Sequence, residues 1–213
     1  METHHHLPDD LLLAYAAGSL AEGWSLAVAS HLTYCTSCRQ RDAALEAIGT
    51  AALEGMPPEP MDAGAFEACM ARAESAVAEQ RLNVVAGSNT PAPLRRYLGC
   101  ELDAVKWSPL GGGIRQYLIE TGDETRARLL YIPPGEDVPQ HTHQGLELTL
   151  VLAGSFADGD EEFHAGDIEV ADETVDHTPV SGPNGPCICL AVTDAPLVFR
   201  RWLPRMIQHF AKI

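Results

Sequence analysis

Apolar residues recur at intervals of three and four along the first 80 positions of the chain. That spacing is typical of amphipathic helices. It predicts helices over about 9–18, 22–39 and 41–53, with Asp9 or Asp10 as the first N-cap. The segment EGMPPEP at 54–60 interrupts the pattern because proline cannot continue a helix, and Asp62 is expected to cap a fourth helix after it.

The pattern changes in the second half, where short β-branched runs such as RARLLYI, ELTLVLAGSF and CICLAV are separated by Gly, Pro and Asp turns. Runs spaced about ten residues apart indicate an antiparallel sandwich or barrel. The stretch NVVAGSNTPAP is typical of a linker. We therefore expect an α + β two-domain chain, with a small all-α domain (1–82), a linker (83–93) and a β-barrel domain (94–213) that ends in an arm, RRWLPRMIQHFAKI.

The charge balance narrows the class of partner. The 213 residues contain 30 acidic and 14 basic side chains, a formal net charge of −16, which repels phosphate backbones. The first 85 residues contain four arginines, no lysine and twelve acidic residues, so a zinc-finger DNA-binding domain is excluded. A basic protein suits this surface better than nucleic acid does.

The apolar run LLLAYAAGSLA could be mistaken for a secretory leader. Glu2, Asp9 and Asp10 stand where a leader carries lysine or arginine, and no stretch approaches the roughly 18 apolar residues of a membrane span. We expect a cytoplasmic protein without membrane contact. In that compartment its six cysteines are thiols or metal ligands in preference to disulfides.

The stretch HLTYCTSCRQ holds a candidate zinc site. His31, Cys35 and Cys38 are spaced i, i+4 and i+7, so they share one face of a helix, and thiolate and imidazole are the ligands of closed zinc sites. The fourth ligand is expected from HHH at 4–6, where we favour His6 over His4 and His5. The alternative is that the two cysteines are small buried residues and the histidines an unordered chain start.

These residues carry a resemblance to a known family. The early histidine, LLLAYAAGSL and HLTYCTSCR resemble the zinc-binding domain of anti-sigma factors of the ChrR type, over about the first 80 residues. The resemblance implies that His6, His31, Cys35 and Cys38 bind one zinc. It also implies that the partner is a sigma factor of the extracytoplasmic-function class.

A second metal site is expected in GEDVPQHTHQGLELTLVLAG, which matches the first cupin motif at every fixed position. His141 and His143 are two residues apart and face one side of a strand, and Glu147 re-enters from across a turn. The resemblance adds His177, which follows the turn HAGD, whereas His164 is a poorer candidate. The fold implied for residues 94–213 is a jelly-roll-like cupin barrel. Zinc is the first choice of metal, with manganese, iron and nickel as alternatives.

The fourth helix carries an apolar stripe of Phe66, Met70, Ala73 and Val77. Such a stripe is most often core packing. Here it stands between a proline-rich hinge and a linker, so a partner-binding face is the second interpretation. The family resemblance favours that face, because the fourth helix of the family packs against the sigma factor.

Two functions follow from these features. The first is an anti-sigma factor without enzymatic activity, whose cupin domain controls release under oxidative stress such as singlet oxygen or organic peroxide. The alternative is a metal-dependent cupin dioxygenase or hydrolase with an N-terminal interaction module. The fused helical domain favours the first. The sequence identifies neither the signal nor a redox role for Cys187 and Cys189.

Overall fold

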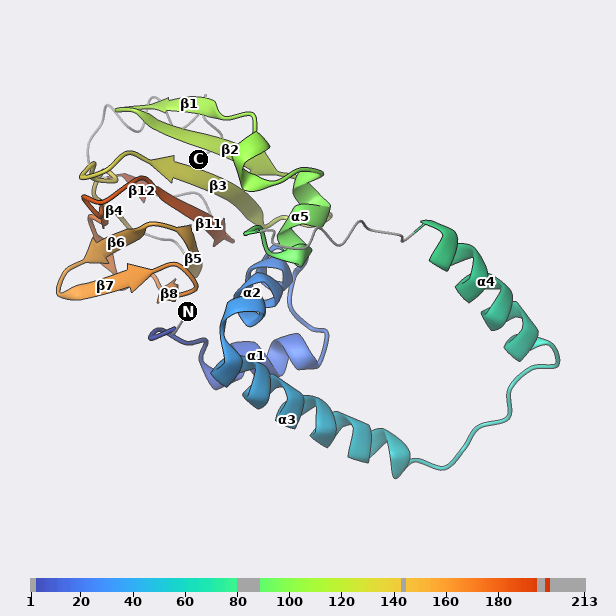
Figure 1. The fold of residues 1–213 in the computed structure, drawn as a ribbon. Helices are drawn as coiled ribbons and strands as arrows, with labels where there is room; N and C mark the ends of the chain where they lie inside the picture. The colour runs from blue at the N-terminus through green and yellow to red at the C-terminus, as the bar shows by residue number, and fades with distance from the viewer. Residues whose placement is uncertain (1–2, 80–88, 143–144, 195–197, 200–213) are drawn as a thin grey trace.

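A helical part and a strand part lie side by side in the computed structural model (Figure 1). The structure describes residues 3–79, 89–142, 145–194 and 198–199. The helices are α1 (Asp9–Ala16), α2 (Glu22–Tyr34), α3 (Thr36–Glu54), α4 (Ala65–Glu79) and α5 (Ala92–Leu98), and a short 3-10 helix covers Leu102–Ala104. The strands are β1 (Ser108–Gly111), β2 (Ile114–Ile119), β3 (Arg126–Ile132), β4 (His141–Thr142), β5 (Glu147–Ala153), β6 (Ser155–Asp158), β7 (Glu161–His164), β8 (Ile168–Ala171), β9 (Asp176–His177), β10 (Val180–Ser181), β11 (Cys187–Thr193) and β12 (Val198–Phe199).

The predicted single helix over 22–39 is wrong. Helix α2 ends at Tyr34, and Cys35 has an extended backbone with φ −91° and ψ 109°. The Cys35 thiol then accepts a hydrogen bond from the backbone N–H of Cys38 at 3.3 Å, which makes Cys35 the N-cap of α3. The motif therefore forms a corner between two helices and not one continuous face.

The predicted N-caps also need correction. Pro8 is the N-cap of α1, and Asp9 and Asp10 lie in its first turn, where a carboxylate favours the helix dipole. Helix α4 begins at Ala65, and Asp62 contributes its backbone carbonyl to the turn before it, accepting from Ala65 N–H at 3.0 Å. Asp9 and Asp10 therefore mark the first turn of the helix and not its N-cap residue.

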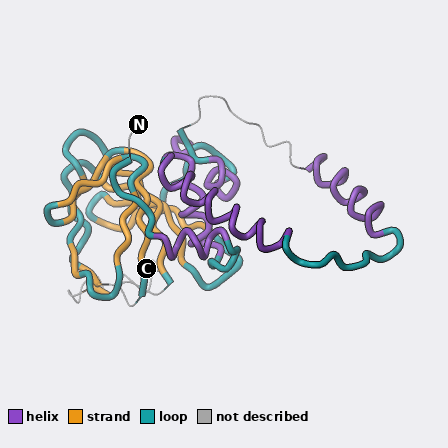
Figure 2. Tube along the Cα trace, turned by 90° about the horizontal axis from the view of Figure 1, so that it is seen from below, coloured by secondary structure: helices purple, strands orange, loops and turns teal. Residues whose placement is uncertain are grey.

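Helix α4 lies apart from the rest of the molecule in both views (Figures 1 and 2). The chain reaches it from α3 through residues 55–64, which include three prolines. Its side chains from Phe66 to Ser75 are all exposed. The side chain of Val77 lies outside the described part. The described side chains of this helix contribute nothing to the core around α1, α2 and α3.

The strands form antiparallel sheets. A six-stranded sheet has the order β1-β2-β3-β11-β5-β8, and two three-stranded sheets have the orders β10-β6-β7 and β12-β4-β9. This confirms the antiparallel cupin-like domain. The expected C-terminal arm at 200–213 and most of the expected linker lie outside the described residues.

The central strands β5 and β11 of the six-stranded sheet are buried on both faces. On β11, Leu190 and Val192 join one core with Leu26 and Val28 of α2, whereas Cys189 belongs to a second core inside the barrel. Helix α2 packs on β5 and β11, and α5 packs in turn on α2. The domain ranges from the sequence stay a prediction, and the structure adds that the helical part and the barrel share a hydrophobic core.

The described helices include none that is both long and apolar enough to cross a membrane.

Candidate metal centres

The first candidate centre lies at the α2–α3 corner. The ligand atoms of His6, His31, Cys35 and Cys38 all lie within 4.8 Å of one another. His6 Nδ1 is 3.2 Å from Cys35 Sγ, and His31 Nε2 is 3.3 Å from Cys38 Sγ. Ligand atoms around a tetrahedral zinc ion are roughly 3.3–3.8 Å apart, from Zn–S and Zn–N bonds of about 2.3 and 2.0 Å. The four residues therefore fit a closed zinc site.

The electrostatics of the corner suit a metal ligand set. Burial lowers the pKa of His31 to about 4, so its ring is neutral at physiological pH, the form that binds metals. Burial alone would raise the pKa of Cys35, but hydrogen bonds from the Thr3 hydroxyl and from Cys38 outweigh it and hold that pKa below its usual value. Burial and the neighbouring Cys35 raise the pKa of Cys38 to about 11. A bound cation would offset the cost of placing a second thiolate there.

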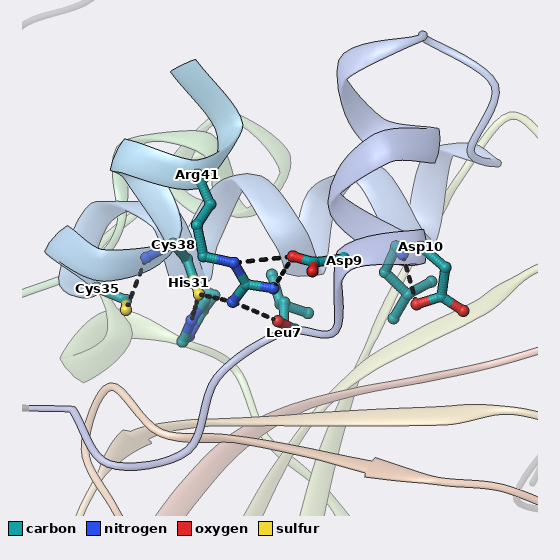
Figure 3. Close-up of polar contacts among 8 residues, drawn as sticks. Leu7, Asp9, Asp10, His31, Cys35, Cys38 and Arg41 are labelled. Carbon is teal, nitrogen blue, oxygen red and sulfur yellow. Dashed lines mark hydrogen bonds and ion pairs between the residues drawn. The ribbon is translucent and has the colours of Figure 1, made fainter. Parts of the chain in front are cut away.

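Arg41 ties the N-terminal segment to α3 (Figure 3). Its guanidinium pairs with Asp9 and donates to the Leu7 carbonyl at 2.9 Å. It also lies 4.0 Å from Cys38 Sγ. The contacts hold the segment that carries His6 against the corner. Sequence reasoning missed Arg41, and its only signal was its position three residues after the second cysteine.

His31 also contacts the barrel. Its Nδ1 lies 3.0 Å from the carbonyl oxygen of Gly166, in the turn between β7 and β8. A carbonyl can only accept, so Nδ1 carries the proton and Nε2 presents its lone pair to the corner. Imidazole ligands of metals are commonly held in this way by a backbone carbonyl.

The second candidate centre lies in the barrel, where the Nε2 atoms of His141 and His177 are 3.1 Å apart. The Nδ1 of His141 is 2.9 Å from the Pro139 carbonyl, and the Nδ1 of His177 is 2.9 Å from Asp158 Oδ2. Both Nδ1 atoms therefore donate, and two Nε2 lone pairs would face each other. A proton on His177, whose pKa is raised to about 9, or a metal ion between the rings relieves that repulsion, and a metal ion would take the place of that proton.

Two acidic residues that sequence reasoning missed surround His177. Asp158, Glu169 and His177 have ligand atoms within 4.8 Å of one another, and Glu169 Oε1 is 3.7 Å from His177 Nδ1. Burial would lower the pKa of His177, but the two carboxylates raise it to about 9. Glu169 was recognisable only as an acidic residue within the apolar run IEV of β8.

The other predicted barrel residues are placed as follows. Glu147 is buried, accepts a hydrogen bond from the Thr149 hydroxyl at 2.9 Å and lines the same cavity of about 290 Å³ as His141. In the described residues, Glu147 is not part of the cluster around His177. His143 lies outside the described residues. His164 is 55% exposed, as expected for a residue that is not a ligand.

Comparison with known proteins agrees with both parts of the fold. Residues 96–196 match the family described as the ChrR Cupin-like domain. The whole chain is 47% identical to the anti-sigma-E factor ChrR of Cereibacter sphaeroides over the full length of both proteins. The crystal structure of Rhodobacter sphaeroides SigE in complex with the anti-sigma ChrR superposes with a TM-score of 0.79 and 47% identity, covering 90% of this chain and 99% of that one.

Proposed function

The chain belongs to the ChrR family of anti-sigma factors, and on that premise we propose that it binds a sigma factor of the extracytoplasmic-function class and withholds it from RNA polymerase. The observation that carries the proposal is the 47% identity over the full length, which includes both the helical part and the barrel. The role is that of a regulator and not of an enzyme.

The binding surface we propose runs along the outer half of α3, the segment 55–64 and α4, and we call it the open arm. It exposes six large apolar side chains by 45–73%: Ile48, Leu53, Met56, Met61, Phe66 and Met70. An apolar surface of this extent is typical of a protein interface. Of the stripe predicted from the sequence, Phe66, Met70 and Ala73 lie exposed on this arm, which supports the partner interpretation over core packing.

The charge of the open arm supports a basic partner. Residues 42–79 contain eight acidic side chains and one arginine. Such a surface attracts a protein whose own charges are basic, as a DNA-binding regulator needs. It also repels nucleic acid, so the chain would act on the sigma factor and not on the promoter.

The zinc proposed at His6, His31, Cys35 and Cys38 serves as scaffold in this account. It joins the N-terminal segment to the corner from which α3 projects toward the open arm. A closed four-ligand site stabilises a small helical unit that has little core of its own. The zinc thus sets the direction of α3 and does not contact the partner.

The barrel metal is proposed as the sensor part, on His141, His177, Glu147 and, by the motif, His143. Zinc is the first choice, and manganese, iron or nickel would suit the same ligands. The cavity beside His141 gives small oxidants a route to the centre. Release of the sigma factor under oxidative stress, by singlet oxygen or an organic peroxide, would start there.

Co-purification with a tagged sigma factor of this class tests the proposal. Phe66→Glu places a charge on the open arm and should reduce recovery of the complex at least tenfold. Leu118→Glu is the matched control, because Leu118 is a partly exposed apolar residue on β2 of the barrel. Recovery of the Phe66→Glu chain at the wild-type level would contradict the proposed surface.

A further inference from the structure

We propose that Asp167 of the barrel is a positioning residue for the N-terminal zinc site, which it serves by fixing the chain segment that carries His6. The inference rests on the proposed zinc site and adds a residue from the other domain to it. The turn at 164–167, HAGD, was read from the sequence only as a turn of the barrel.

The Asp167 carboxylate collects three backbone N–H groups. Oδ1 accepts from His4 at 2.6 Å and from His5 at 3.1 Å, and Oδ2 accepts from His164 at 2.9 Å. Asp167 itself is fully buried. Burial would raise the pKa of Asp167, but these hydrogen bonds outweigh it and hold that pKa below its usual value. The carboxylate therefore stays ionised. It binds the N-terminal segment at His4 and His5 and the barrel turn at His164.

The side chain of His5 adds a second attachment, to strand β7, which leads into the same turn. Its ring lies on Phe163 with centroids 4.1 Å apart, and its Nε2 is 3.2 Å from the Glu162 carbonyl. His6 is the next residue, and its Nδ1 reaches Cys35 Sγ at 3.2 Å. A terminal segment is poorly ordered unless it is tied down, and here the barrel holds His4 and His5 in addition to the contacts that Arg41 makes with Leu7 and Asp9.

The same turn holds a second zinc ligand. The carbonyl of Gly166 fixes the ring of His31, as described above. The turn is in turn anchored to β5, because Gly166 N–H donates to the Val151 carbonyl at 2.8 Å and Val151 N–H donates to the Asp167 carbonyl at 3.0 Å. Two of the four ligands are thus positioned by one barrel turn, which couples the barrel to the helical corner.

Cobalt titration of the full chain tests the inference. Thiolate-to-cobalt absorption reports a centre with cysteine ligands. Because Cys189 lines the barrel cavity beside His141, the absorption that remains in Cys38→Ser is subtracted, and the difference reports the centre that contains Cys35 and Cys38. Asp167→Ala should weaken cobalt binding at this centre about 10- to 100-fold, the range for groups that orient metal ligands. Asp160→Ala removes the same charge from the exposed β6–β7 turn and should leave the affinity within about twofold.

Two controls separate positioning from general stability. Ile132→Ala truncates a buried barrel residue outside the turn, and it should lower the unfolding temperature without weakening cobalt binding. If Asp167→Ala does not fold, Asp167→Asn is the second variant. It keeps one acceptor oxygen for the backbone N–H groups and loses the other, so it should weaken binding several-fold relative to Asp160→Asn.

Wild-type affinity in Asp167→Ala would overturn the inference and leave the zinc site standing. An equal loss in Ile132→Ala, or equal affinities of Asp167→Asn and Asp160→Asn, would also overturn it. Absence of the thiolate-to-cobalt band in the wild-type chain would overturn both the zinc site and its positioning.

Discussion

His141 and His177 face each other through Nε2 atoms 3.1 Å apart, while Pro139 and Asp158 accept from their Nδ1 atoms. This arrangement orients two rings toward one point before any metal is considered. It makes Asp158 part of the centre although Asp158 belongs to no ligand motif. The candidate centre in the barrel therefore includes Asp158 of β6 and Glu169 of β8 beside the histidines.

Asp158→Ala is expected to weaken metal binding in the barrel about 10- to 100-fold, because the ring of His177 loses the carboxylate that orients it. The affinity is measured as the metal that each variant retains after dialysis against increasing concentrations of a chelator. Asp160→Ala, in the adjacent turn, should retain metal as the wild type does. Equal retention by the two variants would show that Asp158 does not orient the ligand.

Cys38→Ser should remove one metal ion per chain and lower the unfolding temperature by roughly 10 °C. A lost closed zinc site costs on the order of several kcal/mol, and each kcal/mol shifts the midpoint of a chain of this size by about 2–4 °C. Cys100→Ser, a half-buried cysteine outside both clusters, is the control. A Cys38→Ser chain with the full metal content would exclude Cys38 as a ligand.

His177→Ala should leave repression intact but abolish induction by oxidant, because the open arm is untouched while the barrel centre is lost. A reporter from a sigma-dependent promoter, with and without oxidant, measures both. His164→Ala is the control, since His164 is exposed and expected to bind no metal. Normal induction in the His177→Ala strain would remove the sensor role from this centre.

Stability of the metal-free chain should fall as the pH drops from about 6.5 toward 4. The pKa of His31 is lowered to about 4 in the folded chain, because burial favours the neutral ring. The stability that this shift contributes is fully present above the unfolded pKa of about 6.5, and it is lost as the pH falls toward 4 and the ring is protonated. The loss by about pH 4 is on the order of 3 kcal/mol, from 1.36 kcal/mol for each pKa unit. Urea unfolding across this range, compared with His31→Gln, isolates the effect. Parallel curves for the two chains would contradict it.

The four residues of the N-terminal cluster could be predicted to converge because thiolate and imidazole at short spacing are chemically distinctive. The helix break could not, since Cys35 caps α3 through its own thiol and cysteine is not a usual N-cap residue. The four ligands converge because the chain turns at Cys35. The prediction that these four residues lie together is therefore confirmed, but the reason given for it, one continuous helix, is wrong.

The contacts between the helical part and the barrel were beyond sequence reasoning. The hydrogen bond between His4 and Asp167 joins positions 163 residues apart, and no local pattern reports it. Strand β5 is buried from Glu147 to Leu152, so both of its faces are covered, although its sequence ELTLVLA begins with alternating polar and apolar residues. That sequence did not show that α2 is the cover on the outer face.

Transcription in vitro tests the central claim most directly. Purified RNA polymerase carrying an extracytoplasmic-function sigma factor should stop transcribing from its promoter when an equimolar amount of the chain is added, and Phe66→Glu should require at least tenfold more protein. Transcription by the same polymerase with its housekeeping sigma factor should be unchanged. Undiminished transcription at an excess of the wild-type chain, with every sigma factor of this class from the same cell, would contradict the account.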